Sequence, residues 1–209
     1  MQYDRNNPSP RYRELLKCYT DLHRLGDQEM EIAPDEMFDG RSLMLHIDPI
    51  KALVEQYGVS SLLDYGSGKA KAYDQVVLSS PDGRKIKGVR EFWGVDEIRF
   101  YDPGLEEFSE LPTSTFDCVI STDVLEHCPE EDMGWIVNEI FGFSQKFVLC
   151  TVALYPAGKT LPNGENAHVT LKSIGWWVDL FEKISKLNNQ RKFYLIGMRT
   201  AKDMSIYQG

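Results

Sequence analysis

A short glycine-rich stretch has the residue types and spacing of a ligand-binding loop. Two leucines lead into Asp64, and a turn that contains Gly66 and Gly68 follows at once. This pattern is typical of a buried parallel strand that runs into a loop shaped around a ligand. Glycine permits a positive φ and lets the backbone approach a ligand closely. We therefore expect a small molecule to bind at the end of this strand.

The spacing of the loop does not match two common nucleotide-binding motifs. A dinucleotide fingerprint reads G-x-G-x-x-G, but Lys71 stands where its third glycine belongs. No G-x-x-x-x-G-K-[ST] sequence occurs, so a P-loop is also excluded. The frame that remains is D-x-G-x-G-x-A, from Asp64 to Ala70, with a later acid, Asp102, after a second apolar run.

A second segment matches the same pattern of strand and polar turn. Residues 116–127 read F-D-C-V-I-S-T-D-V-L-E-H. Together, the two segments resemble the glycine loop and the fourth-strand signature of the class I S-adenosylmethionine-dependent methyltransferases, which is F-D-x-V followed by V-L-E-H. The resemblance covers roughly residues 42–200, so the N-terminal residues lie outside it.

The resemblance implies S-adenosylmethionine as the methyl donor. Gly66 and Gly68 would let the backbone pass the methionine moiety and the ribose. Asp102 would accept hydrogen bonds from the ribose hydroxyls, since a carboxylate offers several lone pairs. Asp96 is the competing acid, but an apolar run leads into Asp102 and a Pro-Gly breaker follows it. The expected donor-binding residues are Asp64, Tyr65, Gly66, Ser67, Gly68, Asp102 and Ser121.

The chain departs from this family in two places. Ala70 replaces the usual third glycine, and only about a dozen residues separate Asp102 from Phe116. The family usually has a helix and a further strand in that interval. We therefore expect a shortened middle section of the sheet. The adenine-contacting residues stay open, with Glu107 and Phe108 as candidates.

A narrower resemblance concerns a possible metal site. The small-RNA terminal 2′-O-methyltransferases and the ubiquinone-pathway catechol O-methyltransferases read E-x-x-E-H with a later histidine, and they use a divalent cation. Here Asp123 stands at the first acid, before Glu126 and His127, and His168 follows later. Carboxylates and imidazoles suit Mg²⁺, Mn²⁺, Fe²⁺ or Zn²⁺, and a cation lowers the pKa of a coordinated hydroxyl.

A metal-free interpretation of the same residues stays open. In many methyltransferases without a metal, the corresponding glutamate and histidine hold the active-site loop. His127 or His168 would then act as the general base. The candidate catalytic residues are Asp123, His127 and His168. His23 and His46 belong to predicted N-terminal helices, where we expect them to be solvated or structural.

Strands that alternate with helices must position these residues. The expected strands are residues 61–65, a run within 93–101, then 116–121, 146–152 and 192–198, with 204–207 as a short partner. The expected helices are 10–25, 42–58 with Ser42 as its cap, 70–78, 129–143 and 172–187. This alternation predicts an α/β fold, Rossmann-like and doubly wound around a mostly parallel sheet. Ligands of such sheets bind at the carboxyl ends of the strands, near a switch point.

Two further segments complete the expected organisation. Residues 1–41 form an N-terminal arm and helix packed on a single methyltransferase domain, residues 42–209. Residues 79–91 are turn-rich and form a surface insertion. The loop at 154–169 is too long for a simple connector, and long loops at this edge often cover a ligand. We expect it to close over the acceptor, with Lys159 and Asn166 as contacts.

Composition limits the possible partners. The net charge of −9 across 209 residues opposes sequence-independent binding to phosphate backbones, so nucleic acid is disfavoured. The four cysteines form no C-x-x-C pair, and no long apolar span occurs. We expect a cytoplasmic protein without membrane insertion. The oligomeric state stays open.

The patterns together predict a methyltransferase that uses S-adenosylmethionine. The expected reaction is O-methylation of a small polar acceptor such as a sugar, with or without a divalent metal. One alternative is an N- or nucleic-acid methyltransferase, although the sequence lacks the N/D-P-P-Y/F motif of enzymes that modify DNA amino groups. The other is a non-catalytic cofactor- or partner-binding module. Wide separation of Asp123, Glu126, His127 and His168 would favour that module.

Overall fold

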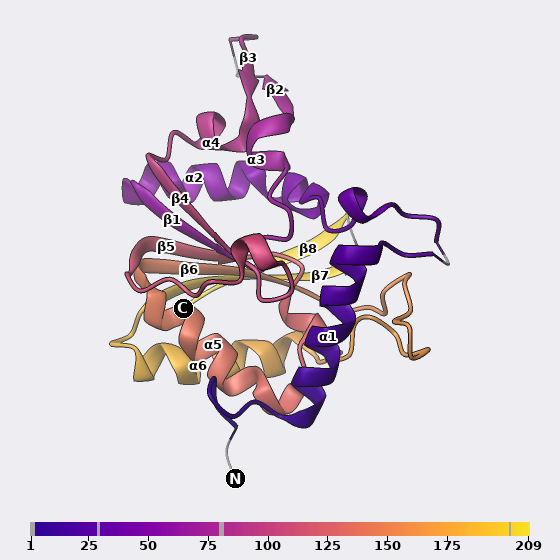
Figure 1. The fold of residues 1–209 in the computed structure, drawn as a ribbon. Helices are drawn as coiled ribbons and strands as arrows, with labels where there is room; N and C mark the ends of the chain where they lie inside the picture. The colour runs from indigo at the N-terminus through magenta and orange to yellow at the C-terminus, as the bar shows by residue number, and fades with distance from the viewer. Residues whose placement is uncertain (1–2, 29, 80–81, 201) are drawn as a thin grey trace.

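A six-stranded sheet in the order β4-β1-β5-β6-β7-β8 forms the centre of the protein (Figure 1). The computed structural model describes residues 3–28, 30–79, 82–200 and 202–209. The strands of the sheet are β1 (Ser61–Tyr65), β4 (Glu97–Tyr101), β5 (Phe116–Ser121), β6 (Ser144–Ala153), β7 (Lys192–Thr200) and β8 (Asp203–Gln208). All neighbouring pairs are parallel except β7 and β8, which are antiparallel. The predicted α/β fold with a mostly parallel sheet is confirmed.

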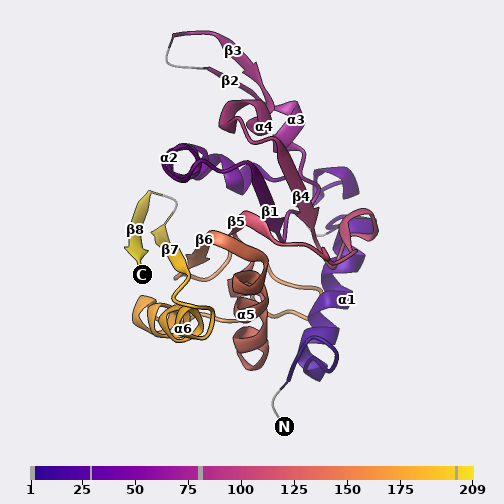
Figure 2. The same cartoon turned by 90° about the vertical axis from the view of Figure 1, so that its left-hand side faces the viewer.

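Helices cover both faces of the sheet (Figures 1 and 2). One face packs against α2 (Ile47–Tyr57), α3 (Ala72–Gln75) and α4 (Gly88–Trp93), and the other against α5 (Met133–Phe143) and α6 (Ile174–Leu187). Successive residues of a strand point to opposite faces. Leu62 accordingly joins the α2 side and Leu63 the α5 side, and both are fully buried. The strands are apolar on both faces because both faces are covered.

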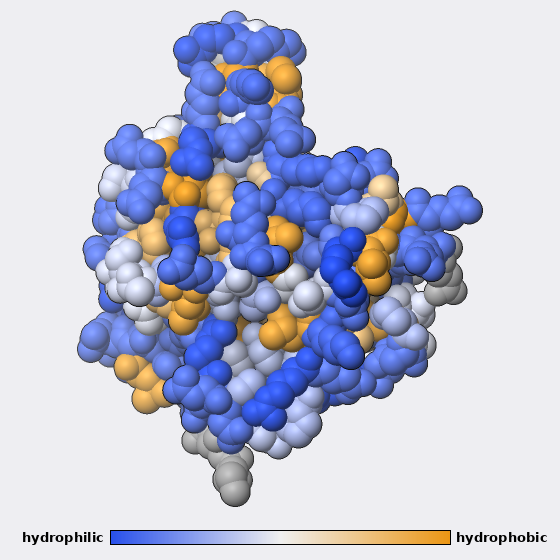
Figure 3. Space-filling model, in the orientation of Figure 1, coloured by the Kyte–Doolittle hydropathy of each residue, from blue (hydrophilic) through white to orange (hydrophobic). Residues whose placement is uncertain are grey.

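A small hairpin projects from the α3–α4 side of the molecule (Figure 1). It consists of β2 (Val77–Ser79) and β3 (Lys85–Lys87), which pair antiparallel outside the main sheet. The surface of this projection is mostly hydrophilic (Figure 3). The expected insertion at 79–91 therefore contains a strand and most of α4, whereas residues 80–81 lie outside the described residues.

The predicted helix at 42–58 begins later than expected. Residues Arg41–Leu45 form a 3₁₀ turn, η2, and α2 begins at Ile47. No side chain caps either element, so Ser42 does not act as an N-cap. The physical reason is Pro49, which cannot donate a backbone hydrogen bond and is tolerated only in the first turn of a helix. A helix that began at Ser42 would have placed this proline in its interior.

The section of the chain between β4 and β5 is shortened, as predicted. β1 pairs with β4 on one side and with β5 on the other, so the strand order diverges at β1. Between β4 and β5 the described chain contains only the short 3₁₀ turn η3 (Glu106–Phe108). β4 is therefore an edge strand, and the switch point lies between β1 and β5.

The N-terminal helix α1 (Pro10–Leu25) lies beside the carboxyl ends of the strands (Figures 1 and 2). The oxygen of Ser9 caps it by accepting a hydrogen bond from the N–H of Tyr12 at 2.9 Å. The segment before it is fixed by Arg5, which forms an ion pair with Glu139 on α5 and donates to the hydroxyl of Tyr101 at 2.8 Å. α1 is thus held against the sheet at its beginning.

The remaining short elements connect these layers. They are η1 (Pro34–Glu36), η4 (Leu125–His127) and η5 (Glu130–Asp132). No helix among the described residues is both long and apolar enough to cross a membrane.

Candidate functional site

A cavity of about 440 Å³ opens at the carboxyl edge of the sheet. The glycine loop after β1, the end of β4 and the turn after β5 form its floor. α1, residues 38–43 and parts of the 154–169 loop form its walls. This is the position at which open α/β sheets bind ligands, and the volume lies within the usual range of small-molecule binding sites.

The glycine loop folds as the sequence predicts. Gly66 and Gly68 have φ values of 86° and 54°, which side chains rarely adopt. The N–H of Gly66 donates to the carbonyl oxygen of Tyr101 on β4, at 2.7 Å. A Cβ atom on Gly66 would overlap the side chain of Val124, and one on Gly68 would overlap the carbonyl oxygen of Phe38. Glycine is therefore required at both positions by the packing of the chain itself.

A buried carboxylate, Asp64, lines the cavity beside this loop. Its Oδ2 accepts a hydrogen bond from the hydroxyl of Tyr73 at 2.8 Å, whereas Oδ1 has no partner among the described residues. Burial, together with the charge of Asp102, raises the pKa of Asp64 to about 7, and the hydrogen bond from Tyr73 opposes this change. An unpaired buried carboxylate oxygen costs free energy. A cationic or hydrogen-bond-donating ligand in the cavity would satisfy it.

Asp102 lies on the opposite side of the glycine loop. Its Oδ2 accepts from the N–H of Gly68 and its Oδ1 from the N–H of Gly104, both at 2.9 Å. Burial raises the pKa of this carboxyl, and the two backbone hydrogen bonds oppose that change. The competing acid, Asp96, is exposed and precedes β4, so it lies at the other end of the strand. Of these two acids, only Asp102 lines the cavity.

Two of the predicted donor-binding side chains do not face the cavity. Tyr65 points to the other face of the sheet, where its hydroxyl donates to Glu139 at 2.7 Å. Ser121 is fully buried within β5, and its hydroxyl has no partner in the described part of the chain. Neither lines the cavity, whereas Asp64, Gly66, Ser67, Gly68 and Asp102 do.

Three residues beyond β5 form a group that could hold a metal ion. Asp123, His127 and His168 each offer one ligand atom, and these atoms lie within 4.8 Å of one another. Asp123 follows β5 with a φ of 61°, and its N–H donates to Thr151 Oγ1 at 2.9 Å. Aspartate is one of the few residues that adopt this left-handed conformation readily. The backbone at Asp123 thus turns sharply where the group begins.

Hydrogen bonds to both imidazole rings determine which nitrogen is free. Nδ1 of His127 lies 2.9 Å from the carbonyl oxygen of Ala167, and Nδ1 of His168 lies 2.6 Å from that of Tyr155. A carbonyl oxygen only accepts, so Nδ1 carries the proton in each ring. The lone pair is then on Nε2, as in metal-binding histidines whose other nitrogen donates to a backbone carbonyl. Burial also lowers the pKa of His127 to about 4, so the ring is neutral at pH 7.

Glu126 lies outside this group. Its side chain is fully buried, and Oε1 accepts a hydrogen bond from the N–H of Ala153 at 2.7 Å. Its carbonyl oxygen accepts from the N–H of Thr170 at 3.0 Å. Burial, followed by the charge of Asp123, raises the pKa of Glu126 to about 8. In this structure Glu126 joins the turn after β5 to the end of β6, so three of the four predicted residues are brought together as possible ligands.

The 154–169 loop is held to the protein by its own side chains. Asn166 accepts from the N–H of Ala157 at 2.9 Å and from that of His168 at 3.0 Å, so it shapes the loop. Lys159 lines the cavity, where its ammonium lies 3.0 Å from Asp27 and 5.5 Å from the ring centre of Phe38. Of the two expected acceptor contacts, only Lys159 faces the cavity.

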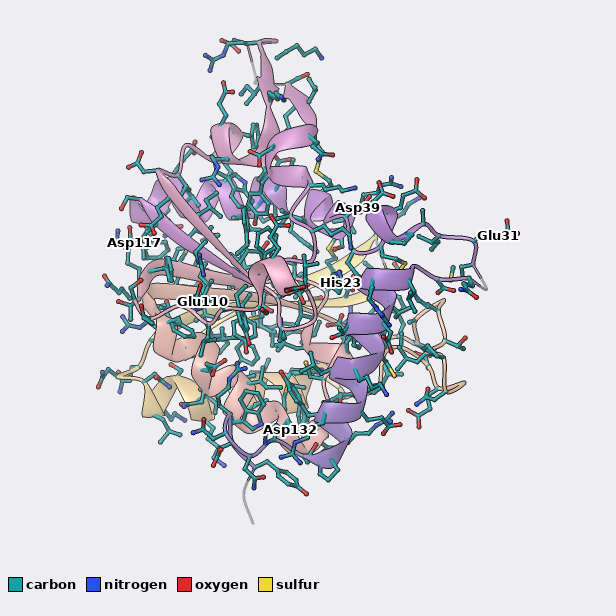
Figure 4. The ribbon with its side chains drawn as sticks, in the orientation of Figure 1. His23, Glu31, Asp39, Glu110, Asp117 and Asp132 are labelled. Atoms are coloured by element: carbon teal, nitrogen blue, oxygen red, sulfur yellow. The ribbon has the colours of Figure 1, made fainter. Side chains whose placement is uncertain are left out.

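Sequence reasoning missed the contribution of the N-terminal region to the cavity. His23 is almost fully buried, its Nε2 lies 3.7 Å from Asp102 Oδ1, and its ring centre lies 4.7 Å from that of Phe38. Figure 4 shows His23 at the end of α1, close to the segment that contains Asp39. The available signal was helical spacing, because Tyr19 and His23 are four residues apart and share one face of α1. The expectation that His23 is either solvated or structural omitted its place in the cavity wall.

Comparison with known proteins adds no family to this description. No family model matches the chain, and no curated protein matches it. Its function is therefore argued from the geometry of the cavity.

Proposed function

We propose that the protein is an S-adenosylmethionine-dependent methyltransferase that methylates an oxygen atom of a small acceptor. The observation that carries this proposal is the unpaired, buried Oδ1 of Asp64 beside a two-glycine loop at the switch point of the sheet. Such an oxygen requires a cation or a hydrogen-bond donor, and the proposed ligand carries both a sulfonium and an ammonium group.

The charges around the cavity support a ligand of this kind. Four acidic residues, Asp39, Asp64, Asp102 and Asp123, line the same cavity, and Asp39 forms an ion pair with Arg41. Asp102, which has further lone pairs beyond its bonds to Gly68 and Gly104, would accept hydrogen bonds from ribose hydroxyls. The glycine loop would let a ligand lie close to the backbone between the two acids.

The reaction would be a direct displacement. S-adenosylmethionine supplies an electrophilic methyl group: a C–O bond forms to the acceptor, the C–S bond breaks with its electrons left on sulfur, and the hydroxyl proton is released. The protein's part is to hold the acceptor oxygen in line and to exclude water, which accounts for much of the rate in such reactions. The walls formed by α1 and by the 154–169 loop would do both.

We further propose that Asp123, His127 and His168 hold a divalent cation. Two imidazole nitrogens and one carboxylate oxygen suit Mn²⁺, Fe²⁺ or Zn²⁺ better than Mg²⁺, which prefers oxygen ligands. A bound cation would lower the pKa of the acceptor hydroxyl. The closeness of these three side chains also favours an enzyme over a non-catalytic module, for which a clustered polar group has no use.

Calorimetry with S-adenosylmethionine and with its demethylated product, S-adenosylhomocysteine, tests the proposal. We expect both compounds to bind to the wild-type protein. We expect Asp64→Asn to weaken binding of S-adenosylmethionine more than binding of S-adenosylhomocysteine, because only S-adenosylmethionine carries the sulfonium charge. If the wild-type protein binds neither compound, the proposal is refuted. Methyl transfer that survives complete removal of divalent metals would refute the metal part alone.

A further inference from the structure

α1 presents an apolar stripe to the cavity. Tyr12, Leu16 and Tyr19 are spaced four and three residues apart, and all three line the cavity and are only half-buried. A stripe at this spacing normally packs against a protein core. Here Tyr12 packs in part against Trp135 and Tyr19 in part against Phe38, and the rest of the stripe faces the cavity. Part of its apolar surface is therefore left for a ligand to cover.

The helix also gives the cavity a direction. His23 lies next to Asp102, at the end where the methyl donor is proposed to bind, with its Nε2 3.7 Å from Oδ1. Tyr19 lies at the possible metal site, because its hydroxyl is 2.8 Å from Nδ1 of His127. Tyr12 is seven residues before Tyr19, a distance of about 10 Å along a helix. The apolar stripe therefore continues beyond the metal site, away from the donor end.

The cationic side chains that line the cavity lie at the donor end or beside the possible metal site, where burial and the charge of Lys159 lower the pKa of His127. Lys159 pairs with Asp27 and lies over Phe38, and Arg41 pairs with Asp39 at 2.7 Å. The lining residues of the cavity also include Cys128 and Pro129, which follow His127 and carry no charge. The charged residues of the first half of α1 do not line the cavity: Lys17 is exposed, and Arg11 pairs with Glu14 and Glu165.

This distribution is unsuited to two classes of acceptor. A nucleic acid requires several cations along its phosphates, and the far end of the cavity has none among the described lining residues. A sugar requires a hydrogen-bond partner for each hydroxyl that it buries. An apolar ring, in contrast, would gain from covering Tyr12 and Leu16.

We infer that the acceptor is an uncharged molecule with an apolar, ring-sized body, whose hydroxyl lies at Asp123, His127 and His168 and whose body lies against Tyr12, Leu16 and Tyr19. This inference rests on the proposed function and specifies an apolar body for its small acceptor, in place of the sugar that the sequence suggested. In this arrangement α1 selects the acceptor.

Two probes with the same pair of hydroxyls on different bodies test the inference. cis-Cyclohexane-1,2-diol and methyl β-D-ribofuranoside both carry adjacent aliphatic hydroxyls, but only the first has an apolar ring. Each is titrated into the full-length protein saturated with S-adenosylhomocysteine and Mn²⁺. We expect the cyclohexane diol to bind at least tenfold more tightly. Equal or tighter binding of the riboside, or binding of neither probe, would overturn the inference.

A matched pair of variants on α1 tests the role of the stripe. Leu16→Gln places an amide in the stripe, whereas Leu25→Gln makes the same change at an exposed position of the same helix, outside the cavity. We expect Leu16→Gln to weaken binding of the cyclohexane diol at least tenfold and Leu25→Gln to leave that binding unchanged. Equal affinities for the two variants would contradict the inference.

The controls separate this inference from the proposed function. Binding of S-adenosylhomocysteine and of Mn²⁺ is measured for every variant, and we expect neither to change in Leu16→Gln. If the wild-type protein binds neither S-adenosylhomocysteine nor Mn²⁺, the proposed function fails. If it binds both of them but does not prefer the diol with the apolar ring, the inference alone fails. If Leu16→Gln does not fold, Leu16→Ala replaces it, and the comparison of probes on the wild type decides independently.

Discussion

The hydroxyl oxygen of Tyr19 lies 2.8 Å from Nδ1 of His127, although 108 positions separate the two residues. The same nitrogen lies 2.9 Å from the carbonyl oxygen of Ala167. Since Nδ1 carries one proton, it donates that proton to both oxygens, and the ring of His127 is held by α1 and by the 154–169 loop. Tyr19 orients a residue of the candidate site without belonging to the group of possible ligands.

Replacement of Tyr19 by phenylalanine should weaken metal binding. Loss of a hydrogen bond to a metal-binding histidine typically lowers metal affinity 10–100-fold. We expect at least about a tenfold loss of Mn²⁺ affinity in Tyr19→Phe, measured by calorimetry. Tyr57→Phe is the control, because it removes a tyrosine hydroxyl that is bonded at 2.7 Å to Tyr194, and neither residue lines the cavity. Equal Mn²⁺ affinities of the two variants would show that Tyr19 does not position His127.

The two candidate ribose acids should behave differently. Asp102→Ala removes a carboxylate from the cavity and leaves the N–H groups of Gly68 and Gly104 without their acceptor, so we expect binding of S-adenosylhomocysteine to weaken at least about tenfold. Asp96→Ala changes an exposed residue outside the cavity, and we expect no effect. Calorimetry on both variants makes the comparison. A larger loss for Asp96→Ala would reverse the assignment.

Asp64 should make the stability of the protein depend on pH. Burial raises the pKa of this carboxyl from 3.8 to about 7, so between these values the folded state binds a proton that the unfolded state has released. The free energy of unfolding therefore falls as the pH rises through this window, by up to about 1.4 kcal/mol per pH unit. Below the unfolded pKa the contribution is fully present.

Asp64→Asn isolates this contribution because asparagine does not titrate. We expect the free energy of unfolding of the wild type to fall relative to that of the variant between pH 4 and pH 7, by an amount on the order of 4 kcal/mol at most. Urea denaturation at unit steps of pH measures both proteins, and the other titrating groups cancel in the difference. Parallel pH profiles would mean that the pKa of Asp64 is not raised by folding.

Substitutions at two glycines should separate the cost of a strained backbone from the cost of steric overlap with neighbouring atoms. Gly164 has a φ of 83° and nothing within 4 Å of an added Cβ, so Gly164→Ala should cost only about 1 kcal/mol of conformational strain. Gly68 has a φ of 54°, and a Cβ there would overlap the carbonyl oxygen of Phe38. We expect Gly68→Ala to cost about 1–3 kcal/mol more, since backbone must move. Chemical denaturation measures both variants, and equal losses would mean that Phe38 does not restrict the loop.

The parts of the fold that local sequence determines were predictable. The bounds of β1 and β5 match the predicted ranges 61–65 and 116–121, because each strand is a short apolar run buried on both faces. The position of Asp102 at the end of a strand was predictable because an apolar run precedes it and a Pro-Gly breaker follows it. The shortened connection between β4 and β5 followed from the number of residues available.

Contacts between distant segments were not predictable from the sequence. Glu126 and His127 are neighbours in the turn η4. The carboxylate of Glu126 points to the end of β6, whereas the imidazole of His127 faces the cavity. A single sequence does not fix that difference. Similarly, nothing local places His23 beside Asp102, because that contact depends on how α1 packs across the strand ends.

Because β4 lies at the edge of the sheet, segments outside the sheet complete the cavity. The cavity can therefore be lost while the sheet stays folded. No further strand of the described chain extends the sheet beyond β4, and the cavity is completed by α1 and residues 38–43. α1 reaches the cavity through contacts such as those of Tyr19 with His127 and of His23 with Asp102, which join residues 108 and 79 positions apart in the sequence. Local unfolding requires less free energy than global unfolding. Detachment of α1 alone would thus dismantle the site and leave the six strands paired, so that occupancy by a ligand protects the N-terminal helix more than it protects the core.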